Sequence, residues 1–206
     1  MSEKNKKNLS KYHWLSFIYD AAVGNSLFNR ARQREFELAK IQPSQRVLIV
    51  GMGTGLDLPY IPLDAEVVGI DLSSDMLSQA RLKAINRNAS FYEMNAEELS
   101  FEERSFDIVI LNLILSVVGN PRKTMTEVYR VIKPAGSIWV LGKFTEQRIG
   151  FLRKTLSFVT SALGGANLNL SLNELIRELP LIKVYEEKRF MTDIIGLKVS
   201  GNRSSG

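Results

Sequence analysis

The stretch VLIVGMGTG, residues 47–55, decides how this chain folds. Its first four residues are apolar β-formers, and they run directly into a loop with glycine at every second position. A buried strand that ends in such a loop is how an open α/β sheet builds a nucleotide cradle. Glycine suits this place because it adopts positive φ and lets a ligand approach the backbone without meeting a Cβ. The loop alone would also fit an ordinary tight turn, so the flanking sequence is needed to distinguish a turn from a nucleotide site.

The flanking sequence favours a nucleoside site. A second apolar run, residues 67–70, ends in Asp71, about 20 residues after the first glycine, where an acidic residue takes a ribose diol. The dinucleotide fingerprint needs a small sixth residue and a long helix, but here the sixth residue is Leu56, and Pro59 and Pro62 follow. Because proline is tolerated only in a first helical turn, this helix must be short or begin late. A nucleoside without phosphates therefore fits better than a dinucleotide.

Four motifs together resemble the class I, Rossmann-like S-adenosylmethionine-dependent methyltransferases. They are VLIVGMGTGLDLP (47–59), VVGIDLSSDMLSQA (67–80), NAEELSFEERSFDIVI (95–110) and EVYRVIKPAGSIWVLGKF (127–144). The resemblance covers roughly residues 40 to 145, in the family's order and spacing. GMGTGLDLPYIP followed by GIDLSSDML is most similar to the soluble bacterial phosphatidylethanolamine N-methyltransferases. The quinone C-methyltransferases are close behind.

The resemblance implies an α/β fold. We expect a Rossmann-like, seven-stranded, mostly parallel sheet with an antiparallel C-terminal hairpin strand, helices on both faces and an N-terminal helical cover. The whole chain, 1–206, is expected to be a single methyltransferase domain. Its parts would be the helical cover (1–40), the cofactor-binding core (41–145), substrate-side helices with the last strands (146–200) and a tail (201–206).

The apolar periodicities and turn signals place the elements. Helices are expected over about 26–40, from the N-cap Ser73 to about 86, over 121–133 and over 171–179. Strands are expected over 47–50, 67–70, 89–94, 106–111, 137–141, 181–189 and 191–199, with a turn at 134–136 before the fifth strand.

The resemblance also implies S-adenosylmethionine as the cofactor and a set of residues that bind it. Asn95 follows the third strand, where the family places an acidic or amide side chain next to the adenine, and an amide can both donate and accept. Asn112 stands at the carboxyl end of the fourth strand, the edge where open α/β sheets bind ligands. The loop 112–120 should then border the transferring methyl group. The expected cofactor-binding residues are Gly51, Met52, Gly53, Gly55, Asp71, Leu72, Met76, Asn95, Ala96 and Asn112.

Two departures from the family pattern affect the site. Methyltransferases of this kind usually carry an acidic residue two positions before the first glycine, and here that residue is Ile49. Asn95 replaces the commoner aspartate, which keeps an acceptor but loses the charge. No catalytic proton acceptor can be identified from the sequence. Tyr19 and Asp20 are candidates for contacting an amine substrate, and surface or packing roles explain them equally well.

Composition excludes several function classes. The 206 residues contain no cysteine and one histidine, His13, so disulfides and thiolate chemistry are excluded and no metal site is expected. A Ser-His-Asp hydrolase is also excluded, because its nucleophile turn is missing. No apolar run has the length of a membrane span, and no secretory signal pattern opens the chain. We therefore expect a cytoplasmic protein.

The net charge of +5 comes largely from residues before position 41. These are Lys4, Lys6, Lys7, Lys11, Arg30, Arg32 and Arg34, and solvated helix faces would explain most of them. Trp14 and Phe17 share one helical face in the same region. They either pack against the sheet or form a cover over the cofactor that also touches lipid, since a lysine-flanked helix with aromatic residues suits a membrane interface. Nucleic acid is not expected as a partner, because the charge is dispersed.

The sequence thus predicts an S-adenosylmethionine-dependent methyltransferase that N-methylates a phospholipid head group such as phosphatidylethanolamine. One alternative is a methyltransferase for a small soluble or quinone-like acceptor. The other is a cofactor-binding protein without transferase activity. If the acceptor is a phospholipid head group, residues 1–23 would serve access to a substrate at the inner face of the membrane.

Overall fold

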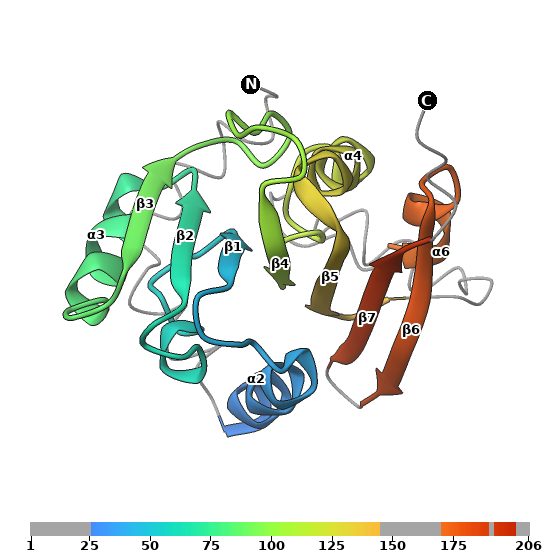
Figure 1. The fold of residues 1–206 in the computed structure, drawn as a ribbon. Helices are drawn as coiled ribbons and strands as arrows, with labels where there is room; N and C mark the ends of the chain where they lie inside the picture. The colour runs from blue at the N-terminus through green and yellow to red at the C-terminus, as the bar shows by residue number, and fades with distance from the viewer. Residues whose placement is uncertain (1–25, 145–169, 190–191, 201–206) are drawn as a thin grey trace, which may run out of the picture.

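The computed structural model describes residues 26–144, 170–189 and 192–200, which build a sheet flanked by helices (Figure 1). Predictions for residues 1–25 and 145–169, including those for His13, Trp14, Phe17, Tyr19 and Asp20, lie outside the described residues. The strands are β1 (Arg46–Val50), β2 (Glu66–Asp71), β3 (Ala89–Glu93), β4 (Phe106–Asn112), β5 (Ile132–Gly142), β6 (Leu181–Lys188) and β7 (Asp193–Val199). The helices are α2 (Ser26–Ala39), the 3-10 helix η1 (Leu58–Tyr60), α3 (Ser74–Lys83), α4 (Pro121–Val131) and α6 (Leu172–Ile176).

The strands form a seven-stranded sheet in the order β3-β2-β1-β4-β5-β7-β6. β1 to β5 run parallel to one another, whereas β7 is antiparallel to both β5 and β6. The predicted mixed sheet is therefore confirmed. The chain moves outward from β1 to β3 and then returns to place β4 on the other side of β1. In open α/β sheets, such a switch in strand order leaves a crevice at the carboxyl ends, where ligands bind.

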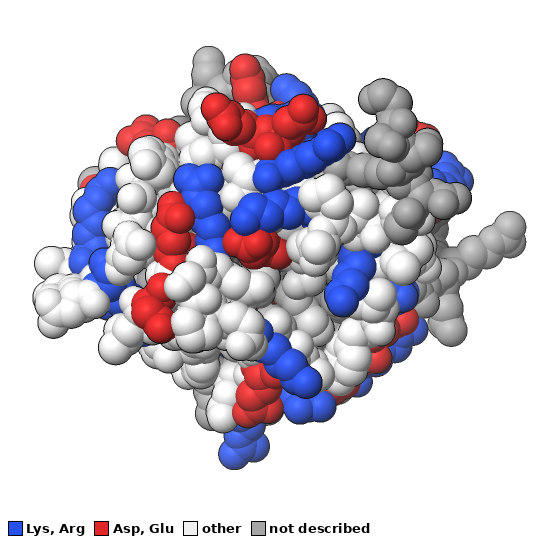
Figure 2. Space-filling view, in the orientation of Figure 1, with Lys and Arg blue, Asp and Glu red and all other residues white. Residues whose placement is uncertain are grey.

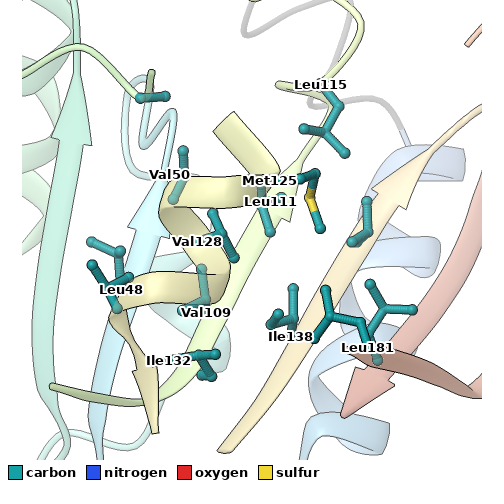
Figure 3. Packing of buried hydrophobic residues seen from close by; sticks show 14 of the residues in the cluster. Leu48, Val50, Val109, Leu111, Leu115, Met125, Val128, Ile132, Ile138 and Leu181 are labelled. Atoms are coloured by element: carbon teal, nitrogen blue, oxygen red, sulfur yellow. The ribbon is translucent and has the colours of Figure 1, made fainter. Parts of the chain in front are cut away.

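Both faces of the sheet are buried, which explains why its strands read as continuous apolar runs. In β1, Leu48 and Val50 face one cluster while Val47 and Ile49 face the other. Figure 3 shows the first cluster, in which Met125 and Val128 of α4 pack over the sheet. The opposite cluster holds Ala31 and Phe36 of α2 with Leu77 and Ala80 of α3. Helices therefore cover both faces, as predicted.

The element boundaries differ from the prediction by three residues or more in three places. α6 ends at Ile176, three residues before the expected end at residue 179. α3 ends at Lys83, three residues before the expected end at about residue 86. The turn expected at 134–136 is instead part of β5, whose pairing with β4 is irregular between Phe106 and Ile108. At Gly136 the backbone approaches β4 so closely that a Cβ would lie 2.7 Å from the Asp107 carbonyl oxygen. Pro134 lies within this irregular part of the pairing, where its missing backbone N–H interrupts no regular ladder.

The helix after the glycine loop is short, as the two prolines predicted. η1 spans only three residues, with Pro59 in its first turn. Within the described ranges, no helix is both long and apolar enough to cross a bilayer. On the face drawn in Figure 2, acidic and basic side chains are interspersed, as on an ordinary solvated surface.

Candidate functional site

The predicted cofactor residues converge on one pocket at the carboxyl ends of β1, β2 and β4. The pocket encloses about 1010 Å³ of space, part of it open to solvent. Every residue predicted to bind the cofactor lines it except Gly55. Those that do are Gly51, Met52, Gly53, Asp71, Leu72, Met76, Asn95, Ala96 and Asn112.

The three glycines of the loop have different reasons to lack a side chain. Their φ angles are +74°, +55° and +81° at Gly51, Gly53 and Gly55, a region that other residues rarely adopt. A Cβ on Gly51 would collide with Ile114, and one on Gly55 would lie 3.1 Å from the backbone of Ala80 in α3. A Cβ on Gly53 would meet no atom within 4 Å. Gly55 therefore serves packing behind the pocket, while Gly53 keeps space open within it.

Asp71 at the end of β2 is held by backbone donors. Its Oδ2 accepts the N–H of Gly53 at 2.8 Å, and its Oδ1 accepts the N–H of Ser73 at 3.0 Å. Burial raises the pKa of the Asp71 carboxyl, and the backbone N–H groups of Ser73, Gly53 and Leu72 oppose that rise. A carboxylate oxygen has more than one acceptor site, so both oxygens can still accept hydroxyl groups.

The next turn of the chain brings Met76 into the pocket. Ser73 caps α3, because its side chain accepts the N–H of Met76 at 3.3 Å. This confirms the predicted N-cap. The cap fixes the first turn of the helix, and Met76 is consequently buried at the pocket wall.

Asn95 closes a turn as well as lining the pocket. Its Oδ1 accepts the N–H of Glu97 at 3.1 Å, the bond of an Asx-type turn. The turn thus uses one acceptor position of the amide oxygen.

A buried charge pair, not predicted from the sequence, lies beside Asn112. Asp57 Oδ1 accepts from Arg32 Nε of α2 at 2.5 Å and from Asn112 Nδ2 at 3.0 Å. The side chains of Arg32 and Asp57 are only 4% and 6% exposed. Arg32 is therefore an exception to the solvated helix faces that were expected to explain most of these basic residues. Arg32 faces inward because its guanidinium finds the Asp57 carboxylate there, which a buried cation requires.

Glu35, one turn further along α2, is fully buried near this pair. Burial raises the pKa of the Glu35 carboxyl well above its usual value, and the negative charge of Asp57 adds to the rise. The Asn112 amide and the Arg32 cation act in the opposite direction but do not cancel it. Arg32 and Glu35 stand between Ala31 and Phe36, both core residues. Charged residues inside an apolar helical stripe were the signal that sequence reasoning overlooked.

Residues 48–140 match the family model described as a methyltransferase domain. The resemblance found in the four motifs is thereby confirmed. The domain implies S-adenosylmethionine as its cofactor, in agreement with the prediction from those motifs.

Two curated relatives show how far the similarity extends. Phosphatidylethanolamine N-methyltransferase of Cereibacter sphaeroides is 34% identical over 125 residues, which are 58% of this chain and 62% of that protein. The ubiquinone/menaquinone biosynthesis C-methyltransferase UbiE of Brucella anthropi is 32% identical over 169 residues, which are 74% of this chain and 63% of that protein. The chain therefore spans less than two thirds of the length of these relatives.

Solved structures share the fold of the methyltransferase domain. A chain from a complex with the Haloferax volcanii Trm112 methyltransferase activator matches with a TM-score of 0.78 at 15% identity, covering 96% of this chain and 99% of that one. A SAM-dependent methyltransferase from Aquifex aeolicus matches with a TM-score of 0.64 at 16% identity, covering 82% and 89%. At these identities the likeness concerns the fold, and it confirms the predicted fold class.

The residues of the pocket fit S-adenosylmethionine. Asp71 retains acceptor capacity for the two ribose hydroxyls. Gly53 leaves open the space that a Cβ would occupy. Asn112 lines the pocket at the end of β4, and its Oδ1 is buried without a hydrogen-bond partner among the described residues.

Proposed function

We propose that this protein transfers a methyl group from S-adenosylmethionine to an acceptor. The observation that carries the proposal is the convergence of the glycine loop, Asp71, Asn95 and Asn112 on one pocket. In this proposal Asp71 accepts the ribose hydroxyls, and Asn95 presents its Nδ2 group to the adenine. Asn112 forms part of the pocket wall at the amino-acid end. Met52 and Met76 supply apolar surface between these polar groups.

Catalysis would rest on alignment rather than on proton transfer by the protein. The bound cofactor supplies an electrophilic methyl group. Among the described residues that line the pocket, the ionisable ones are Arg32, Asp57 and Asp71. Arg32 and Asp57 are paired with each other, and Asp71 is assigned to the loop and the ribose hydroxyls. Positioning and exclusion of water can lower a barrier by about 7–11 kcal/mol, which makes a protein base unnecessary for an acceptor that loses its proton to water.

The acceptor we propose is the amine of a phospholipid head group such as phosphatidylethanolamine. The relative from Cereibacter sphaeroides and the GMGTGLDLPYIP motif support this choice. Tyr19 and Asp20 would contact the amine, and the lysine-rich residues 1–23 would rest on the anionic inner face of the membrane. The protein would then act in the cytoplasm as a single domain, in peripheral contact with lipid.

A quinone-like acceptor is the second candidate. The relative from Brucella anthropi aligns with 74% of this chain, against 58% for the phospholipid enzyme, so the matched segment is longer. A small soluble acceptor would need the same cofactor site. A protein that binds the cofactor without transferring its methyl group is the third candidate, because Ile49 replaces the usual acidic residue.

Two measurements separate these candidates. Transfer of labelled methyl groups should be assayed with phosphatidylethanolamine vesicles, a demethylated quinone and a panel of soluble amines. Incorporation into the vesicle lipid supports the proposal, and incorporation only into the quinone or the soluble amines replaces it with the second candidate. Calorimetric binding of S-adenosylhomocysteine without transfer to any acceptor would support the third.

A further inference from the structure

Three buried acceptor atoms belong to two side chains that act on each other, Glu35 and Asn112. They are both carboxyl oxygens of Glu35 and the Oδ1 of Asn112, and none of the three has a partner with hydrogen-bond geometry within the described part of the chain. Glu35 is 0% exposed and comes from α2, whereas Asn112 is 9% exposed and ends β4. A buried polar atom without a partner costs about 1–3 kcal/mol, so three in one place require an explanation.

The charges around Glu35 decide whether its carboxyl group can be ionised. Arg32 and Asp57 form a pair and neutralise each other. An ionised Glu35 would add a buried negative charge next to the Asp57 carboxylate, with no second cation among the described groups that act on it. A single proton on Glu35 removes that charge and converts one acceptor into a donor. The acceptor available to this donor is the unpartnered Oδ1 of Asn112.

We propose that Glu35 is held as a neutral carboxylic acid whose hydroxyl donates to Asn112 Oδ1 and so fixes the Asn112 amide at the pocket wall. Glu35 is then a positioning residue, since it does not line the pocket itself. The amide is held from both ends, because its Nδ2 already donates to Asp57. The effect on cofactor binding rests on the proposed function, whereas the protonation state does not.

The proposal has a consequence for stability at different pH values. The groups facing Glu35 among the described residues are Asp57 from the loop before η1, Arg32 on α2 and Asn112 on β4. A glutamate in the unfolded chain titrates near pH 4.3. Above that pH the unfolded chain loses the proton while the folded protein retains it. Stability contributed by the neutral form is therefore complete below about pH 4.3 and is lost as the pH rises toward the raised pKa of the folded protein.

The first experiment compares wild type with Glu35→Gln by urea denaturation between pH 5 and pH 8. Glutamine is neutral at every pH and carries a donor, so it imitates the protonated acid. For each pH unit, the unfolding equilibrium constant of wild type should rise by up to tenfold relative to that of Glu35→Gln, so the variant becomes the more stable of the two as the pH increases. Glu37→Gln, on the exposed side of the same helix, is the matched control and should follow wild type. Parallel pH profiles for wild type and Glu35→Gln would overturn the proposal.

The second experiment measures S-adenosylhomocysteine affinity by calorimetry at pH 6. Glu35→Gln should bind within about twofold of wild type, and Glu35→Met, which keeps the length but has no donor, should bind about three- to tenfold more weakly. Equal losses in both variants would show that an ionised carboxylate is needed and would overturn the proposal. Wild type that binds no cofactor at all would refute the proposed function, and the pH comparison would still decide the protonation state.

A spectroscopic readout keeps the test independent of folding losses in Glu35→Met. Infrared difference spectra of wild type minus Glu35→Gln should contain the carbonyl-stretching band of a protonated carboxylic acid at neutral pH. A carboxylate band in its place would contradict the neutral state directly.

Discussion

The two polar ends of the pocket solve the problem of a buried carboxyl group in opposite ways. Asp71 and Asn112 end strands on either side of β1, about 10 Å apart by two strand spacings. The oxygens of Asp71 accept backbone N–H groups from Gly53 and Ser73, whereas those of Glu35 accept none within the described residues. Burial raises the pKa at both, but backbone donors oppose the rise only at Asp71. Donors in the backbone therefore decide which acid can stay charged to receive hydroxyls.

The largest expected effect comes from breaking the charge pair at the Asn112 end. Arg32→Met leaves Asp57 buried without its cation, and removing one partner of a buried pair costs about 3–5 kcal/mol. The free energy of unfolding, measured in urea at pH 7, should fall by that amount. Arg30→Met on the exposed side of α2 is the control. A loss below about 1 kcal/mol would mean that the pair behaves like a surface salt bridge.

The next effect concerns the Asp71 end. Asp71→Ala removes hydrogen bonds to a charged acceptor, worth about 1.5–3 kcal/mol in total, so S-adenosylhomocysteine should bind roughly 10- to 150-fold more weakly. The variant also loses the tie to Gly53, so some loop order is lost with it. Calorimetry measures the affinity, and Asp64→Ala, at an exposed loop residue, is the matched control. An unchanged dissociation constant would remove Asp71 from the site.

These two ends also differ in how far the sequence could predict them. The Asp71 end is built from residues 51–76, where a strand, a glycine loop and a capped helix follow each other closely. Short-range patterns of this kind carry their own geometry, so the lining residues could be named in advance. The Asn112 end joins Arg32 and Glu35 to Asp57 and Asn112 across the sheet. No spacing rule connects residues that far apart, and the charge run containing Arg32 suggested a solvated face.

The fold was predicted for a similar reason. Strands buried on both faces read as continuous apolar runs, and β1, β2 and β4 were therefore visible in the sequence. β5 was placed five residues too late because Pro134 and Gly136 indicate a turn in isolation. The irregular pairing of β5 with β4, which only the folded sheet provides, lets these residues continue the strand.

The glycine loop lies between the Asp71 and Asn112 ends of the pocket. Substitutions of its glycines should affect packing and cofactor binding to different degrees. Alanine at either Gly53 or Gly55 must adopt positive φ, which costs about 1–2 kcal/mol of stability. Gly55→Ala should lose more, because its Cβ would press on the backbone of Ala80. Gly53→Ala should lose less stability and more cofactor affinity, because its Cβ enters open space in the pocket. Urea denaturation and calorimetry on both variants test this, and the reverse order would contradict the assignment.

The smallest expected effect is at Asn95, which lies on the Asp71 side of β1. In the proposed function Asn95 donates through its Nδ2 to a ring nitrogen of the adenine, while its Oδ1 accepts from Glu97. A single neutral hydrogen bond is worth about 0.5–1.5 kcal/mol, so Asn95→Ala should weaken S-adenosylhomocysteine binding about two- to tenfold. The exposed Asn88→Ala is the control for loss of an amide.

Selectivity for the base gives the sharper test of Asn95. The inosine analogue of S-adenosylhomocysteine carries a proton on the ring nitrogen that accepts in adenine, so it would meet the Nδ2 donor with another donor. Wild type should therefore prefer the adenine form, and Asn95→Ala should lose much of that preference while binding both forms weakly. If the preference survives unchanged in Asn95→Ala, the base is read elsewhere, and Asn95 serves the turn that its Oδ1 closes with Glu97.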